Sequence, residues 1–497
     1  MGAADGPTRA LLCAIAVVAG VGRFTIWMAG RVVGYDAARI RRERGKESME
    51  RAAATRPNVI WIFGDQHRAQ ALGVAGDPNV HTPHLDRLAA EGVTFTGAVS
   101  GTPLCCPARG SLLTSQYPHR AVPGHEYRLP PTQPTIAHAF HDAGYRTAYF
   151  GKWHLDGFHE REGRGALHIV PPERRGGFDT WVGYENNNSP WDSWVHGGTG
   201  AGAFHYRLPG YETDALTDLV IDYLHERGEE AAQGTPRPFF AILSVQPPHN
   251  PYVAPAPEMA RHTPGTICLR PNVPAIGWVR ERAARELAGY YAMIENLDAN
   301  VGRIRSALDL AGLALDTHIV FFSDHGDLHG SHGQFLKTAP WEEAIRVPCI
   351  LGGRMNAYGD LQGRHAVPIN HVDFAPTTLG LCGIEPPTWM VGTDYSGYRI
   401  RGRALSREPE SAFLQLVVPT SHADSVDRPW RGVVTRDGWK YIALEGQPWL
   451  LFNLNDDPYE QVNLAHNTRF AAARRRLHDL LASWIHDTSD TFLLPAV

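Results

Sequence analysis

The stretch RPNVIWIFGD, residues 56–65, is an apolar run bounded by a proline on one side and by Gly-Asp on the other. A short apolar run between turn signals predicts a strand that is buried in a sheet. The stretch THIVFFSDHG, residues 317–326, repeats the pattern and again ends on an aspartate, here followed by His-Gly. We therefore expect two buried strands, each delivering a carboxylate to the point where the strand ends.

Between these two strands, and after them, strand-like and helix-like segments alternate. An amphipathic helix is predicted for residues 212–228, a long helix for residues 280–313, and a helix for residues 82–92 that Thr82 caps and Gly92 ends. Further strands are predicted within residues 145–154, 237–249 and 345–351. This alternation predicts an α/β fold with a large, mostly parallel central sheet flanked by helices.

The pattern changes after about residue 387. Residues 432–458 alternate in polarity and carry Asp-Gly and Glu-Gly turn signals, which predicts an antiparallel meander. Residues 469–487 predict a closing helix. We expect a leader at 1–55, a main domain at 56–387 and a smaller C-terminal α+β subdomain, built on an antiparallel sheet, at 388–497.

Composition narrows the class of protein. The formal net charge of the 497 residues is −5 and no basic stripe is present, so we expect no nucleic-acid partner. The six cysteines form no C-x-x-C pair, which argues against a disulfide framework or a zinc site of that type. Composition leaves the oligomeric state open.

The N-terminus allows two interpretations. The apolar run between Arg9 and Arg23 resembles the core of a signal peptide, although no small-x-small cleavage site follows it. In that case the protein is periplasmic or secreted. Alternatively, translation starts near Met49 and the protein is cytoplasmic.

Ionisable residues gather where the predicted strands end. Ligand sites of open α/β sheets lie at the carboxyl ends of the strands, so residues in these positions are expected to share one site. Lys152 and His154 are two apart and should point the same way, with Trp153 buried on the other face. The residues at or just beyond strand ends are Asp65, Lys152, His154, His249, Asp324 and His325.

A pair of adjacent cysteines precedes a predicted helix. In CCPARGSLLT, residues 105–114, Pro107 and the residues after it mark a helix N-terminus just after Cys106. Helix N-termini favour anions and lower the pKa of a thiol, and Arg109 adds positive charge in the first turn. We therefore expect one of the two thiols to take part in chemistry.

This stretch resembles the signature C-x-P-x-R-x-x-x-L-T of the formylglycine-dependent sulfatases, members of the alkaline phosphatase superfamily. Cys105 matches the cysteine that the family oxidises to formylglycine, and Cys106 falls at the x position as a packing residue. Ser115 stands where the family usually has glycine. Further blocks resemble the family in the expected order from residue 56 to the end: FGKWHLDG (150–157), PPHNPY (247–252) and NDDPYEQVNL (455–464).

The resemblance implies a role for each matching residue. One divalent cation would be held by Asp65, Gln66, Asp324, His325 and the modified Cys105. Two carboxylates neutralise such an ion, and the imidazole softens the site, so Mn²⁺ is the alternative to Ca²⁺. The resemblance also implies a formylglycine-generating enzyme as the maturation partner, and it leaves His329 and His332 in structural roles.

The resemblance likewise implies catalytic roles. Arg109 would hold the modified side chain, and Lys152 and Lys337 would stabilise the sulfate oxygens. His249 and Lys337 would assist the leaving alcohol, and His154 would be the base that regenerates the aldehyde. Asp324 would take the proton of the nucleophile. The residues with catalytic roles are Cys105, Arg109, Lys152, His154, His249 and Lys337.

The implied activity is the hydrolysis of small-molecule or carbohydrate sulfate monoesters. A phosphonate or phosphate ester hydrolase of the same superfamily is the alternative, because the Gln66 and His325 pattern resembles such enzymes too. A non-catalytic binding protein on the same fold is a third hypothesis. The segment Tyr184–Gly200, with Trp191 and Trp194, is expected to be a loop that walls the substrate pocket.

Overall fold

The computed structural model describes residues 23–28, 31–36, 56–353, 360–420 and 426–496. The predicted leader and the alternative start at Met49 lie outside these residues. The chain divides between residues 55 and 56 into two compact units. In the first, β1 (Arg23–Met28) pairs antiparallel with β2 (Arg31–Asp36).

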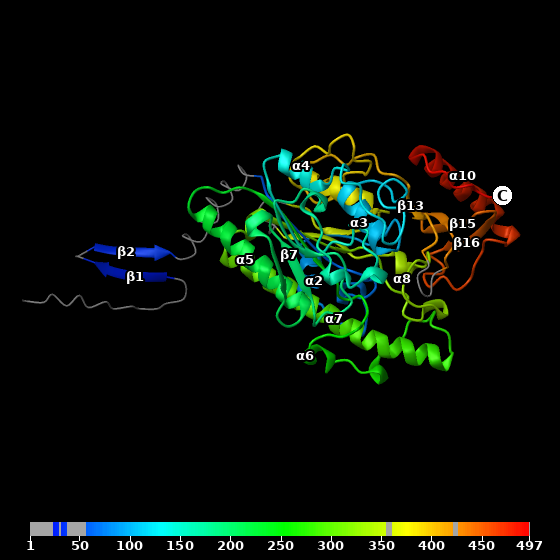
Figure 1. The fold of residues 1–497 in the computed structure, drawn as a ribbon, viewed down its shortest axis with the longest axis horizontal. Helices are drawn as coiled ribbons and strands as arrows, with labels where there is room; N and C mark the ends of the chain where they lie inside the picture. The colour runs from blue at the N-terminus through cyan, green and yellow to red at the C-terminus, as the bar shows by residue number, and fades with distance from the viewer. Residues whose placement is uncertain (1–22, 29–30, 37–55, 354–359, 421–425, 497) are drawn as a thin grey trace, which may run out of the picture. The chain divides into compact units, whose positions relative to one another are not determined.

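The second unit is built on a ten-stranded sheet of order β12-β4-β11-β10-β3-β9-β5-β6-β7-β8 (Figure 1). Its middle five strands, from β10 to β6, run parallel, whereas β11 and β7 are antiparallel to their neighbours. The strands are β3 (Asn58–Gly64), β4 (Val93–Phe95), β5 (Arg146–Lys152), β6 (Thr180–Tyr184), β7 (Trp194–Gly197), β8 (Phe204–Arg207), β9 (Phe239–Val245), β10 (Thr317–Ser323), β11 (Cys349–Gly353) and β12 (Gly363–His365).

Helices cover both faces of this sheet. In β3, Ile60 and Ile62 pack with α2 (Pro83–Ala90), α5 (Glu212–Ala232) and α7 (Gly277–Leu310). The alternate residue Trp61 packs on the opposite face, where α3 (Cys105–Thr114), α4 (Ile136–Asp142) and α9 (Phe374–Leu381) lie. Because side chains alternate along a strand, a strand buried in this way must be apolar at every position, as residues 58–63 largely are.

A smaller antiparallel sheet follows in the chain. Its strands pair in the order β13 (Ser411–Leu416), β14 (Trp430–Thr435), β15 (Trp439–Leu444), β16 (Gln447–Asn453). One face packs on α10 (Ala471–Thr488). The other face packs on the segment after β10, which contains the short helix α8 (Glu342–Ile345). The predicted class, an α/β sheet with a C-terminal α+β portion, is confirmed; the domain boundary at residue 387 stays a prediction.

Three local expectations need correction. The segment Tyr184–Gly200 is not simply a loop, because its last third forms β7 of the large sheet. Trp191 packs on Tyr211 and Trp194 packs on His205 of β8, with ring centroids 5.2 Å apart in each pair. Both tryptophans thus have a packing role, and the wall of the substrate pocket stays a prediction.

The other two corrections concern strand and helix ends. Strand β5 ends at Lys152 and His154 has a φ of 56°, so strand alternation does not explain its direction. Helix α3 begins at Cys105, which puts Arg109 in the second turn, four residues on and on the same helix face. A further short helix is α6 (Ala256–Met259). Among the described helices, none is both long and apolar enough to cross a membrane.

Candidate active site

The predicted site residues meet at the carboxyl ends of the parallel strands. Asp65 follows β3, Lys152 ends β5, and Asp324 and His325 follow β10. Cys105 reaches the same place as the first residue of α3, and all five side chains are buried. Helix and strand ends therefore converge on one buried point, as expected from the position of these residues in the chain.

Cys105 lies in a cluster that could hold a metal ion. Ligand atoms of Asp65, Cys105, Asp324 and His325 all lie within 4.8 Å of one another. Cys105 Sγ is 3.2 Å from His325 Nε2 and 3.5 Å from Asp65 Oδ1. His325 Nδ1 lies 3.0 Å from the carbonyl oxygen of Gly326, which can only accept, so Nδ1 carries the proton. The lone pair of Nε2 is thereby aimed at the cluster, as a metal ligand requires.

The amide group of Gln66 bears on whether the site fits a cation. Its Nε2 donates to Asp327 Oδ2 at 2.5 Å and to the hydroxyl of Tyr252 at 3.4 Å. Because the carboxylate of Asp327 accepts, this contact fixes which end of the amide is which. The other end, Oε1, is buried without a hydrogen-bond partner. A buried carbonyl oxygen left unpaired in the residue that follows Asp65 fits a hard cation.

Three cationic side chains surround the cluster. Arg109 binds Asp324 Oδ2 through Nε at 3.1 Å and Asp65 Oδ2 through a terminal nitrogen at 3.2 Å. Lys152 Nζ lies 2.6 Å from Asp65 Oδ2. Lys337 Nζ lies 3.1 Å from Cys105 Sγ. The positive charges thus converge on the Cys105 side chain and the carboxylates next to it.

These charges shift the ionisation of their neighbours. Burial alone would raise the pKa of Asp65, but the charges of Lys152, His249, Lys337 and Arg109 hold it well below its ordinary value. Burial and the Asp65 carboxylate oppose ionisation of Cys105, yet Lys337 and Lys152 lower the pKa of its thiol overall. The site thus favours negative charge at the position of the Cys105 side chain.

His154 and His249 stand beside the cluster as neutral imidazoles. Burial and then the charge of Lys152 lower the pKa of His154 well below its ordinary value. Burial and then Lys337 do the same for His249, whose Nδ1 lies 2.7 Å from the carbonyl oxygen of Asn250. All predicted catalytic and ligand residues are therefore brought together.

Two supporting residues were not predicted from the sequence. Glu185, buried just beyond β6, accepts backbone N–H groups from Leu155, Asp156 and Gly157 at 2.9–3.2 Å, and so holds the turn that follows His154. Ser244, near the end of β9, accepts from Arg109 at 2.8 Å. Applying the strand-end rule to β6 and β9 would have pointed to both residues.

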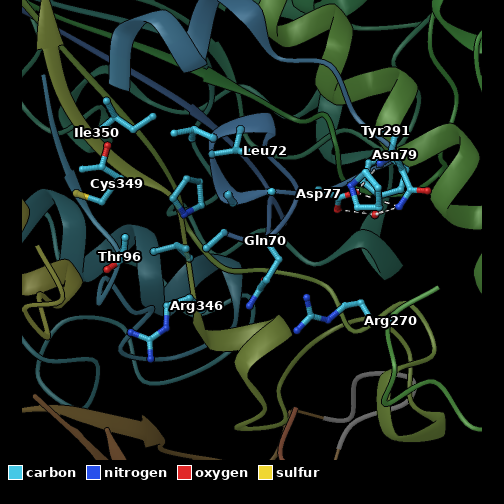
Figure 2. A pocket seen from close by; sticks show the side chains of 18 of the residues that line it. Gln70, Leu72, Asp77, Asn79, Thr96, Arg270, Tyr291, Arg346, Cys349 and Ile350 are labelled. Carbon is cyan, nitrogen blue, oxygen red and sulfur yellow. Dashed lines mark hydrogen bonds between the residues drawn. The ribbon is translucent and has the colours of Figure 1, made fainter. Parts of the chain in front are cut away.

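A sizeable cavity lies elsewhere. It has a volume of about 530 Å³, and none of the predicted site residues lines it. Figure 2 shows Gln70, Arg270 and Arg346 on its polar side and Leu72 and Ile350 on its apolar side. Burial raises the pKa of its Cys349 thiol far above the ordinary value, which disfavours that thiol as a nucleophile. The cluster of carboxylates, cations and an acidified thiol lies around Cys105 and not in this cavity.

Comparison with known proteins decides the family. The model of the sulfatase family matches residues 57–384, about two thirds of the chain, and that of the C-terminal region of N-sulphoglucosamine sulphohydrolase matches residues 330–487. The chain belongs to the sulfatase family. It is 33% identical to the ulvan-active sulfatase of Formosa agariphila, over 88% of this chain and 83% of that one.

Solved structures show the same fold. The protein yidJ of Bacteroides fragilis superposes with a TM-score of 0.77 at 28% identity, covering 88% of this sulfatase and 97% of that chain. The phosphonate monoester hydrolase of Agrobacterium radiobacter superposes with a TM-score of 0.69 at 23% identity, covering 87% and 96%, which shows the shared fold alone. The protein is thus a sulfuric ester hydrolase, and the predicted activity is confirmed at that level.

Proposed function

We propose that this sulfatase hydrolyses sulfate monoesters at Cys105, converted to formylglycine, beside one divalent cation. The observation that carries the proposal is the cluster of Asp65, Cys105, Asp324 and His325, whose ligand atoms lie within 4.8 Å of one another. The unpaired Oε1 of Gln66, in the residue next to Asp65, is proposed as the further ligand. Oxygen ligands outnumber the single nitrogen, so Ca²⁺ is the expected ion and Mn²⁺ the alternative.

When present, the modified side chain supplies a nucleophilic oxygen and the cation withdraws charge from the reacting oxygens. The residues around them arrange the substrate. Lys337 and Lys152 bring positive charge to the position where the sulfate oxygens would lie. Arg109 fixes Asp65 and Asp324, which keeps both carboxylates aimed at the cation.

Proton movement falls to Lys337 and the two histidines. In the unconverted protein burial opposes the charge of Lys337, while Cys105 and then Asp65 raise its pKa; Asp65 remains after conversion, and Lys337 is proposed to give its proton to the leaving alcohol. His249 presents an unprotonated Nε2 in the free enzyme, and the negative charge of a bound sulfate would raise its pKa. His154, held neutral, is available to accept the proton that is lost when the aldehyde is restored.

The substrate is proposed to be a small-molecule or carbohydrate sulfate ester. Support comes from a relative that is named for the substrate it acts on, the ulvan-active sulfatase. The supply of formylglycine is proposed to need a formylglycine-generating enzyme.

The test combines mass with activity. Protein co-expressed with a formylglycine-generating enzyme should show one oxygen in place of one sulfur and two hydrogens, mapped to the peptide that carries Cys105. The converted protein should hydrolyse an aryl sulfate faster than an aryl phosphonate. Cys105→Ala should abolish turnover while Cys106→Ala retains it. An unmodified Cys105 in active protein would contradict the mechanism, and faster phosphonate turnover would favour the alternative hydrolase.

A further inference from the structure

The second cysteine of the pair has its own ligand cluster. Ligand atoms of Cys106, His125 and His154 all lie within 4.8 Å of one another, separate from the Cys105 cluster. Cys106 Sγ lies 4.0 Å from His125 Nδ1, and the rings of His125 and His154 are 5.5 Å apart between centroids. One sulfur and two imidazole nitrogens are the donors that borderline-soft metal ions select.

The distance between Cys106 and His125 is close to that between two ligands of a bound zinc ion. With Zn–S near 2.3 Å and Zn–N near 2.0–2.1 Å in a tetrahedron, a sulfur and a nitrogen ligand lie about 3.6 Å apart. The observed 4.0 Å between Cys106 Sγ and His125 Nδ1 needs a contraction of only about 0.4 Å. A rotation of the partly exposed His125 ring suffices for that.

A second observation points to a ligand. His154 is 3% exposed, and its Nδ1 is buried without a hydrogen-bond partner. Buried imidazole nitrogens are normally paired, so an orphaned one in a cluster with a thiol marks a place where a partner is missing. His125 is less buried, with 26% of its side chain exposed, which gives an ion a way in from solvent.

The groups around His125 and Cys106 resemble those that support the ligands of a bound metal ion. The Nε2 of His125 lies 3.7 Å from Glu126 Oε1, on the side of the ring away from Cys106. A carboxylate behind a ligating imidazole orients the ring and strengthens it as a ligand. The backbone N–H of Glu126 also donates to Cys106 Sγ at 3.3 Å, a contact that stabilises a thiolate. The Cys106 thiolate and Glu126 together would balance a divalent charge.

We propose that Cys106, His125 and His154 form a second metal site, selective for Zn²⁺-like ions, whose occupation takes His154 out of the catalytic machinery and inhibits the sulfatase. Binding breaks the S–H bond of Cys106 and releases one proton to solvent while sulfur bonds the metal. One sulfur and two nitrogen donors suit a thiophilic ion, whereas Ca²⁺ prefers oxygen ligands and does not compete. Three protein ligands leave a fourth position for water.

Binding is tested with Cd²⁺, whose bond to a thiolate absorbs in the near ultraviolet. The protein is Cys105→Ser, which cannot be converted and has no thiol in the first cluster, with Ca²⁺ in excess. A saturable absorption band is expected, and it should vanish in Cys105→Ser/Cys106→Ser, which keeps the exposed Cys268 as an internal control. Equal bands in the two proteins would overturn the site. Glu126→Gln should weaken Cd²⁺ binding by roughly 10–100-fold.

Inhibition rests on the proposed function of His154 and is tested separately in the converted enzyme. Zn²⁺ should inhibit aryl sulfate hydrolysis in proportion to its occupation of the site, and a zinc chelator with excess Ca²⁺ should restore the rate. Cys106→Ser, with unchanged basal activity, should resist the same Zn²⁺ concentration. Equal inhibition of Cys106→Ser and the wild type would overturn the sharing of His154. An enzyme without sulfatase activity that still gives the Cd²⁺ band would refute the proposed function and leave the metal site standing.

Discussion

Ser115, where the family usually has glycine, is the left-handed residue that ends helix α3, with a φ of 52°. Glycine adopts such a φ at no steric cost, whereas an L-residue is strained there by about 1–2 kcal/mol. Here the hydroxyl compensates, because it donates to the carbonyl oxygen of Val372 at 2.5 Å and accepts from the N–H of Gly392 at 3.0 Å. The serine therefore ties the end of the helix that carries Cys105 to the segment around α9.

We predict that Ser115→Ala lowers the free energy of unfolding by about 2–4 kcal/mol, because it leaves two buried polar groups unpaired and keeps the strained φ. Ser115→Gly should be more stable than Ser115→Ala by about 1 kcal/mol, since it loses the same bonds but relieves the backbone. Urea unfolding followed by circular dichroism measures both. Equal stability of the two variants would show that the backbone conformation carries no cost.

Gln66 provides the second test at the scale of a residue. We predict that Gln66→Ala weakens cation binding at least about tenfold, the loss seen even where a residue only orients a ligand. The measurement is the cation concentration that restores activity to chelator-treated enzyme, for Ca²⁺ and Mn²⁺ in turn. Gln70→Ala, in the same turn but outside the cluster, is the control. If Gln66→Ala needed no more cation than the control, Gln66 would not be a ligand.

Among the elements of the large sheet, the strongly apolar strands were predictable, whereas the parallel strand β6 and the short strands toward the edges were not. Strands β3, β9 and β10 each contain a continuous apolar run, because helices cover both faces of the sheet there. Such a run is easy to recognise in the sequence. By contrast, β4 and β12 have three residues each, and β7 and β8 lie in a segment rich in Gly, Asn and Trp. Such strands form because a neighbouring strand offers hydrogen bonds. The local sequence does not show where that neighbour lies, so it does not predict these strands.

The site residues, too, divide into those that were predictable from the sequence and those that were not. Residues that follow strong strands, such as Asp65 and Asp324, were found from position and resemblance. Residues that act through others were missed, because Asp327, which fixes Gln66, and Glu185, which fixes the turn after His154, reveal their roles only through contacts distant in sequence. Cys106 was taken as packing alone, since His125 comes near it only in the folded chain.

Glu185 gives a prediction at the scale of the element. The loop leaving β5 starts at a left-handed His154 and is held by backbone hydrogen bonds to one buried carboxyl group. We predict that Glu185→Ala lowers kcat by about 10²-fold, because loss of these bonds lets His154 shift by an ångström or more. Steady-state kinetics should be run well below the melting temperature on protein with unchanged formylglycine content.

Asp179→Ala is the matched control for that experiment. Asp179 also accepts a backbone N–H of β5, that of Thr147 at 2.9 Å, but at the opposite end of the strand. Its loss should cost some stability and leave kcat within about twofold of the wild type, as expected for a change away from the reacting groups. A similar fall in kcat for both variants would mean that Glu185 supports the strand in general and not His154.

At the scale of the whole catalytic unit, the C-terminal sheet supports the segment that carries Lys337. Leu336 and Thr338, on either side of this lysine, both have positive φ, so the segment depends on outside contacts. Trp430 of β14 donates its indole N–H to the carbonyl oxygen of Thr338 at 3.1 Å. Lys440 of β15, fully buried, donates to the carbonyl oxygen of Pro340 at 2.8 Å and pairs with Glu342 and Glu460.

We predict that Lys440→Met lowers the free energy of unfolding by about 3–5 kcal/mol, since it removes the cation beside the buried Glu460 and leaves Glu342 with Arg346 alone. Because the same contacts hold the segment of Lys337, kcat should fall as well, even at temperatures where the variant is fully folded. Arg476→Met is the matched control: its ion pair joins α10 to Asp437 in the turn between β14 and β15, is about half exposed and should contribute less than about 1 kcal/mol. Urea unfolding and steady-state kinetics of both variants measure the difference. A Lys440→Met protein as stable and as active as Arg476→Met would mean that the large sheet alone holds Lys337, and that the C-terminal sheet is dispensable for the site.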